Sequence, residues 1–156
     1  MSQKIGNIAY ICKKGMIMGK AAQKMNFNSV DDREILSLIK KSRKGIKYSA
    51  FNKIQKEVLF KSAEWSKILH LSERTLQRYK KEKIDFSPLY SERIIEIQML
   101  FNKGIEVFGD RDNFYSWLNS KNIVLGGIFP ISLLDNTFGI LLLRDQLTRI
   151  EHGILA

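Results

Sequence analysis

Two arginines and a glutamine at helical spacing are the side chains in this sequence with the clearest chemical use. Arg74, Gln77 and Arg78 would share one face of a helix, because residues three and four apart are neighbours there. A guanidinium group binds guanine through two hydrogen bonds, and a glutamine amide binds adenine in the same way. The lysines that follow would contact phosphates, which positions a protein on DNA without reading its sequence. The predicted DNA-contacting residues are Ser72, Glu73, Arg74, Gln77, Arg78, Lys80 and Lys81.

The residues around this face have the pattern of a helix-turn-helix motif. Counted from Ser62, five positions should be buried, and all five are apolar or aromatic: Trp65, Leu69, Leu71, Leu76 and Tyr79. The position where the two helices cross must be small, and it is Ser66. The turn position, usually glycine because a positive φ is needed, is His70, and Ser72 can cap the second helix. Such helix pairs also occur in proteins that never touch DNA, so a purely structural element is the alternative.

A second pattern occupies the C-terminal part of the chain. It runs through Trp117-Leu118, Leu125-Gly126-Gly127, Pro130, Leu133-Leu134-Asp135, Phe138-Gly139 and Leu147 to Ala156. These spaced residues resemble the C-terminal toxin-binding domain of Xre/MbcA/ParS antitoxins, the neutralising halves of bacterial type II toxin–antitoxin pairs. The helix-turn-helix segment is similar to the Xre-type domain that precedes this block in such antitoxins. The resemblance covers about residues 45–156, and residues 1–44 lie outside it.

The resemblance implies a protein partner rather than a substrate. Antitoxins of this family bind toxins of the RES fold, which consume NAD or transfer ADP-ribose, and their C-terminal end lies at or near the toxin's active-site entrance. Carried over to this sequence, the toxin-binding residues are Arg149, Glu151, His152, Gly153, Ile154, Leu155 and Ala156. The resemblance further implies a homodimer that assembles with toxin and represses its own operator. Gly126-Gly127 and Pro130 are predicted to be structural, at a tight corner.

Two other functions remain open from the sequence. One is a stand-alone helix-turn-helix transcription regulator whose C-terminal half serves only dimerisation, and the other is an antitoxin without operator activity. The apolar residues of the C-terminal half would in the simplest case form that domain's own core, and those left over would contact a second copy or a partner. They are Trp117, Leu125, Phe129, Ile131, Leu133, Leu134, Phe138, Leu142 and Leu147.

The sequence gives no support for an enzyme, and no cofactor or metal is expected. His70 and His152 are the only histidines, and neither has a cysteine or another histidine at the spacing of a zinc site. Asp110 and Asp112 lack the third ligand and the glycine of a calcium loop. A binding protein is therefore favoured over a catalyst.

The net charge of +10 is concentrated in one part of the chain. Residues 1–90 carry 20 Lys or Arg and 8 Asp or Glu, whereas residues 91–156 carry 6 and 8. A basic half joined to a nearly neutral, apolar half indicates one part that faces a polyanion and one that faces protein. The single cysteine, Cys12, suits the reducing cytoplasm, where we expect the protein. The apolar stretch 123–143 is interrupted by three glycines, a proline and Asp135-Asn136, so we expect a folded core there and no membrane span.

The elements that position these residues are all predicted to be helices. Apolar periodicity and capping residues predict helices from Ser29 or Asp31 to Gly45 and over residues 48–58, 88–108, 110–118 and 137–152, besides the two of the motif. In the longest of these helices, Pro88 would take the first position after a Ser87 cap, and Gly109 would follow the last turn. Asp110 would start the next helix. The apolar stripe of the long helix consists of Ile94, Ile97, Phe101, Ile105 and Phe108. No segment has the alternation of a strand. We expect an all-α chain with a basic mobile arm at 1–28, an Xre-like helix-turn-helix domain at 29–95 and a toxin-binding domain at 96–156.

Overall fold

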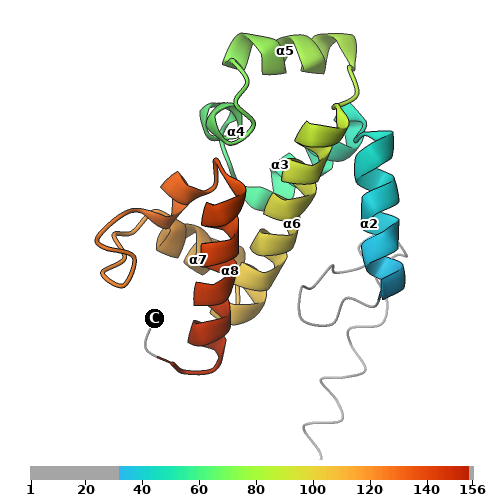
Figure 1. Ribbon diagram of the computed structural model, residues 1–156. Coiled ribbons are helices and arrows are strands. Elements are labelled where there is room, and N and C mark those ends of the chain that lie inside the picture. The colour runs from blue at the N-terminus through green and yellow to red at the C-terminus, as the bar shows by residue number, and fades with distance from the viewer. Residues whose placement is uncertain (1–31, 155–156) are drawn as a thin grey trace, which may run out of the picture.

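The computed structural model describes residues 32–154, which fold into seven α-helices and one short 3-10 helix (Figure 1). Within that range the only extended pairing is an isolated β-bridge between Asn122 and Ile128. The predicted all-α class is therefore confirmed. The elements are α2 (Asp32–Lys44), α3 (Tyr48–Val58), α4 (Ser62–Ile68), α5 (Glu73–Glu82), α6 (Pro88–Phe108), α7 (Arg111–Leu118), η1 (Pro130–Leu133) and α8 (Thr137–Glu151).

The first described helix, α2, ends where the sequence predicts, with Gly45 following it at a φ of +88°. The proposed capping residues Ser29 and Asp31, like the predicted arm at 1–28, lie outside the described residues. Leu38 packs against the core, but Ile35 and Ile39 remain 44% and 37% exposed. One side of α2 is thus apolar and uncovered by the described part of the chain.

Helix α6 is the central element of the fold. Pro88 occupies its first turn and Gly109 ends it, as predicted, although the Ser87 side chain makes no capping hydrogen bond. Helices α2, α3, α7 and α8 all pack against it (Figure 1). Of the predicted apolar stripe, Ile94, Ile97 and Phe101 are buried, and Ile105 and Phe108 are partly buried and packed against the core. Ile95, Met99 and Leu100 are buried as well, because the helix is covered on more than one side.

The polar contacts inside this core are few and specific. The Ser91 hydroxyl accepts a hydrogen bond from the Ile46 backbone N–H at 2.8 Å and donates one to the Phe86 carbonyl at 3.1 Å. These contacts join the start of α6 to the segment between α2 and α3. Because the hydroxyl both donates and accepts, its burial leaves no polar group without a partner.

Two glycines allow close contacts that no other residue would permit. A Cβ at Gly104 of α6 would overlap the ring of Phe114 on α7, and a Cβ at Gly139 of α8 would overlap the backbone carbonyl of Leu133. Neither glycine has a positive φ, so the requirement is one of space. The second contact fixes how α8 begins relative to η1.

We expect Gly139→Ala to lower the free energy of unfolding by about 1–3 kcal/mol, because overpacking against a backbone carbonyl forces the main chain to shift. Helix propensity alone would raise stability by roughly 0.5–1 kcal/mol, so the sign of the change decides between the two effects. Urea unfolding followed by circular dichroism measures it. Leu141→Ala, an exposed position of the same helix, is the control. A free energy equal to or above that of the wild type would contradict the predicted clash.

Candidate functional site

The helix-turn-helix motif is formed by α4 and α5. Trp65, Leu69 and Leu76 are buried as the spacing predicts, and Leu71 and Tyr79 are partly buried and packed against the same core. The Trp65 ring lies edge-on to that of Phe51, with 5.0 Å between the ring centroids. The predicted burial pattern is therefore confirmed.

The turn between the two helices has the backbone conformation that the motif requires. His70 has a φ of +52°, in the left-handed region that a glycine usually occupies at this position. The Ser66 hydroxyl donates to the Leu71 carbonyl at 2.5 Å, which secures the turn from the first helix. Ser72 then caps α5 by accepting a hydrogen bond from the Thr75 backbone N–H at 3.0 Å.

The side chains predicted to contact DNA lie on the outer surface of α5. Ser72, Glu73, Arg74, Gln77, Arg78, Lys80 and Lys81 are all exposed. No ion pair within residues 32–154 involves Arg74 or Arg78. Their guanidinium groups are consequently open to an external acceptor. Helix α5 lies at one end of the molecule, away from the C-terminal end of α8 (Figure 1).

A basic pocket of about 450 Å³ adjoins the end of α5. Its lining includes Lys80 of α5 and Lys83 directly after that helix, Lys47, which precedes α3, and one carboxylate, that of Asp85. Tyr48, Ser49 and Asn52 of α3 complete it. Lys80 was predicted from the sequence as a DNA-contacting residue, but its proximity to Lys47 was not. The two are far apart in the sequence, and only the packing of α3 near the end of α5 brings them together.

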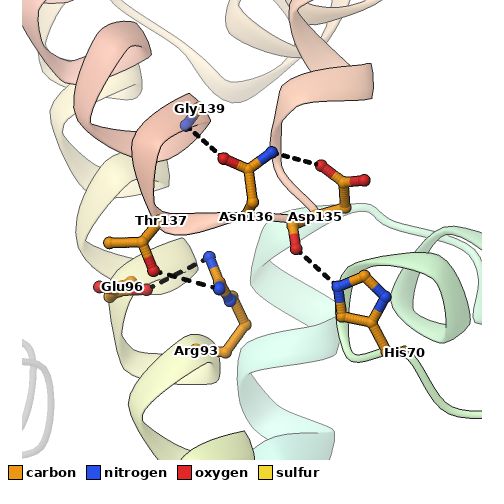
Figure 2. A network of polar contacts seen from close by, with 7 residues as sticks. All are labelled: His70, Arg93, Glu96, Asp135, Asn136, Thr137 and Gly139. Atoms are coloured by element: carbon orange, nitrogen blue, oxygen red, sulfur yellow. Dashed lines mark hydrogen bonds and ion pairs between the residues drawn. The ribbon is translucent and has the colours of Figure 1, made fainter.

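A polar network joins the helix-turn-helix motif to the start of α8 (Figure 2). The Nε2 atom of His70 lies 2.7 Å from the backbone carbonyl oxygen of Asp135. Because a carbonyl only accepts, this nitrogen must carry the proton. The next residue, Asn136, caps α8 by accepting from the Gly139 backbone N–H at 2.8 Å. The residue that departs from the usual glycine of the turn is thus also the one that contacts the C-terminal half.

Arg93 of α6 extends this network. Its guanidinium donates to the Thr137 hydroxyl at 3.3 Å and lies 3.5 Å from a carboxylate oxygen of Glu96 (Figure 2). Burial raises the pKa of Glu96, and the charge of Arg93 partly opposes that rise. The network therefore connects the turn of the motif, the first half of α6 and the start of α8.

The chain leaves α8 through a glycine turn. The backbone N–H of Ile154 donates to the Arg149 carbonyl at 2.9 Å, and that of Gly153 donates to the Ile150 carbonyl at 3.0 Å. With a φ of +66° at Gly153, these two bonds form a Schellman motif. Of the predicted toxin-binding residues, Arg149, Glu151, His152, Gly153 and Ile154 are exposed. Leu155 and Ala156 lie outside the described residues.

Two of these residues have ionic partners within the chain. The guanidinium of Arg149 lies 3.0 Å from a carboxylate oxygen of Asp145. Both carboxylate oxygens of Glu151 accept hydrogen bonds from the ammonium group of Lys103, at 2.7 and 2.6 Å. These bonds hold the pKa of Glu151 below its ordinary value. Lys103 was not predicted from the sequence, although a lysine four residues after Met99 interrupts an apolar row of α6.

The apolar side chains of the C-terminal half divide into two groups. Leu134 and Leu147 are buried, and Trp117, Leu125, Ile131 and Leu133 pack against the core. The other group is exposed: Ile123, Val124, Ile128, Phe129, Phe138, Leu141 and Leu142. Gly126 and Gly127 both have a φ of +79° and form the predicted tight corner beneath part of this second group.

Comparison with known proteins identifies both halves. Residues 37–99 match the model of the antitoxin Xre-like helix-turn-helix domain, and residues 103–153 match that of the antitoxin Xre/MbcA/ParS C-terminal toxin-binding domain. Antitoxin Xre of Photorhabdus laumondii subsp. laumondii is 28% identical over 113 residues, which cover 72% of this chain and 76% of the relative. Antitoxin Xre of Yersinia enterocolitica serotype O:8 is 30% identical over 95 residues, covering 60% and 64%.

The chain belongs to the Xre/MbcA/ParS family of antitoxins. Its fold is similar to that of one chain in the crystal structure of the M. tuberculosis MbcT–MbcA toxin–antitoxin complex, with a TM-score of 0.54 and 17% identity. The match covers 68% of this antitoxin and 94% of that chain. The resemblance inferred from the sequence is thus confirmed. The division at residues 95 and 96 stays a prediction, and α6 runs across it.

Among residues 32–154, no cluster of three or more histidine, cysteine, aspartate or glutamate side chains is arranged to hold a metal ion. Over the same range, none of the helices combines the length and apolar character that crossing a bilayer requires.

We expect the stabilising effect of Glu151 to depend on pH. Its folded-state pKa is lowered, so the carboxylate stabilises the fold above the unfolded-state pKa of about 4.3. This contribution is lost as the pH falls through the folded-state pKa. The wild type should therefore have a higher free energy of unfolding than Glu151→Gln at about pH 7, and the difference should shrink towards about pH 3.

Urea unfolding of both chains across this range measures the difference directly. Comparing the two chains cancels the opposite pH dependence of Glu96, whose pKa is raised. A difference that stays constant from neutral to acid pH would contradict the assignment.

Proposed function

We propose that this antitoxin neutralises a RES-type toxin, an enzyme that consumes NAD or transfers ADP-ribose, by placing its C-terminal end in the toxin's active site. The observation that supports this proposal most strongly is that the end of α8 and Ile154 after it are exposed, in a domain of the toxin-binding family. Ile154 is 59% exposed directly after the glycine turn that closes α8. Arg149 and His152 are exposed beside it.

The exposed apolar group supports a protein partner of some size. Phe138 is 84% exposed, and Leu141 and Leu142 follow it on α8 at 44% and 42%. Leaving aromatic and leucine side chains in water forgoes roughly 25 cal/mol for each Å² of apolar surface. A toxin that covered the exposed side of α8 together with the C-terminal tail, residues 154–156, would recover part of this free energy.

Deletion of residues 154–156 should abolish neutralisation of the toxin while leaving the antitoxin folded, because these residues follow the last helix. The antitoxin and the toxin from the neighbouring reading frame are co-expressed, captured by a tag on the antitoxin, and cellular NAD is measured. The intact antitoxin should co-purify with toxin and keep NAD at its normal level, and the deleted chain should let NAD fall.

The control for this experiment is Arg74→Ala with Arg78→Ala, which changes the opposite end of the molecule and should still neutralise. A deleted chain that protects NAD as well as the intact one would refute the tail mechanism. If the intact antitoxin captures no toxin, and cellular NAD is the same with and without it, the stand-alone transcription regulator would be favoured instead.

We further propose that the antitoxin binds its operator through α5 as a homodimer and represses its own promoter. The support is the exposed face of Arg74, Gln77 and Arg78, the basic pocket at the end of α5, and the excess of cations in residues 1–90. Two copies related by a twofold axis would place their α5 helices in successive major grooves, about 34 Å apart. Because α5 and the C-terminal end of α8 lie at opposite ends of the molecule (Figure 1), one copy can contact DNA and toxin together.

Arg74→Ala with Arg78→Ala should abolish repression of a promoter reporter. Each lost bidentate contact to guanine should weaken operator binding by about 1–3 kcal/mol. Operator affinity measured at several salt concentrations separates this loss from a change in phosphate contacts, which would alter the salt slope. Arg111→Ala with Lys121→Ala, two exposed cations of the toxin-binding half, is the matched control. Equal operator affinity in the wild type and the α5 variant would contradict DNA reading by this helix.

A further inference from the structure

Lys103 is a lysine in a position where an apolar residue would be expected. It lies on α6 and is only 1% exposed. Lysines are almost never buried to this extent unless their charge is paired. Here the ammonium group donates to both oxygens of Glu151, at 2.7 and 2.6 Å, and lies 4.0 Å from a carboxylate oxygen of Glu106.

Burial of this charge is a poor way to stabilise a fold. Removing an ammonium group from water costs free energy that the attraction to a carboxylate often fails to recover, and a well-packed apolar residue commonly stabilises as much or more. A methionine would have nearly the same length and no charge to desolvate. The ion pair therefore calls for a reason other than stability.

The reason lies in what Glu151 is attached to. It is the last residue of α8 and stands two positions before Gly153, where the chain turns away from the helix. The turn itself is closed by the two backbone bonds from Ile154 and Gly153. The ion pair fixes the last turn of α8 to α6, and the glycine turn then fixes the direction in which Ile154 leaves.

We propose that Lys103 is a positioning residue that holds Ile154 in its toxin-binding direction before toxin arrives. This inference rests on the proposed function of the tail. A toxin with a narrow active-site opening has to receive a short segment in one orientation. If only a fraction of the antitoxin molecules holds the segment in that orientation, the observed affinity falls by that fraction. A segment that is already oriented in the free antitoxin avoids this loss. The partner that this arrangement fits is a protein with a concave pocket that accepts the apolar side chain of Ile154.

The test compares full-length chains carrying Lys103→Met, Lys103→Arg and Lys121→Met. Backbone ¹⁵N relaxation of the free antitoxin reports the order of the Gly153 and Ile154 amides, and calorimetric titration with toxin gives the dissociation constant. Lys103→Met should leave the unfolding temperature essentially unchanged, make both amides more mobile and weaken toxin binding about tenfold, which is the loss expected when roughly one molecule in ten is competent. Lys103→Arg keeps a cation that can bond both oxygens and should restore order and affinity. Lys121→Met, at an exposed position of the same half, should change neither.

Equal mobility of the Gly153 and Ile154 amides in the wild type and Lys103→Met would overturn the proposal. So would an affinity loss matched by an equal loss of folded protein, since that would make Lys103 merely structural. Failure of the proposed function has a separate signature, in which the chain lacking residues 154–156 binds toxin as tightly as the intact chain. The relaxation comparison would then still decide whether Lys103 orders Ile154.

Discussion

The burial of α6 on several sides at once is the constraint on which the other elements depend. Its apolar residues fall on successive positions, so no single neighbour can cover them. Helices α2, α3, α7 and α8 each take part of its surface, and α7 approaches closely because Gly104 leaves room for the Phe114 ring. A helix packed in this way acts as a rigid frame. Both candidate binding surfaces take their positions from α6. Helix α5 lies near the N-terminal end of α6, and the last turn of α8 lies near its C-terminal end (Figure 1).

Polar contacts then specify how the parts packed on α6 are aligned. The contact of His70 with the Asp135 carbonyl joins the helix-turn-helix motif to the start of α8, and the pair of Lys103 with Glu151 joins α6 to its end. Apolar packing tolerates small shifts, whereas hydrogen bonds and buried ion pairs have fixed lengths and directions. The two contacts thus define both ends of α8, the helix that carries the exposed apolar residues and the tail.

Features set by neighbouring residues were predictable from the sequence. Glycines 45 and 109, Pro88 and the caps Ser72 and Asp110 mark helix boundaries through local hydrogen bonds and backbone angles, and the structure has them where predicted. The positive φ of His70 follows from its place in the turn. The family resemblance depended on spaced residues in the last third of the chain and is confirmed by both domain matches.

Contacts between distant segments were not predictable in the same way. No local pattern connects Lys103 with Glu151, 48 positions away, or His70 with Asp135. The exposure of apolar side chains on α2 and α8 was likewise not predictable, because periodicity shows which residues share a helix face but not whether a neighbouring element covers that face. Phe138 has the side chain of a typical core residue, yet it is among the most exposed of the large apolar side chains in the described residues.

Hydrogen–deuterium exchange of the antitoxin with and without its toxin tests the central claim most directly, because it maps the binding surface residue by residue. The account predicts slower exchange upon toxin binding in residues 137–154, with residues 73–83 of the helix-turn-helix motif unchanged. Slower exchange confined to residues 73–83, or no change in residues 137–154 at saturating toxin, would contradict it.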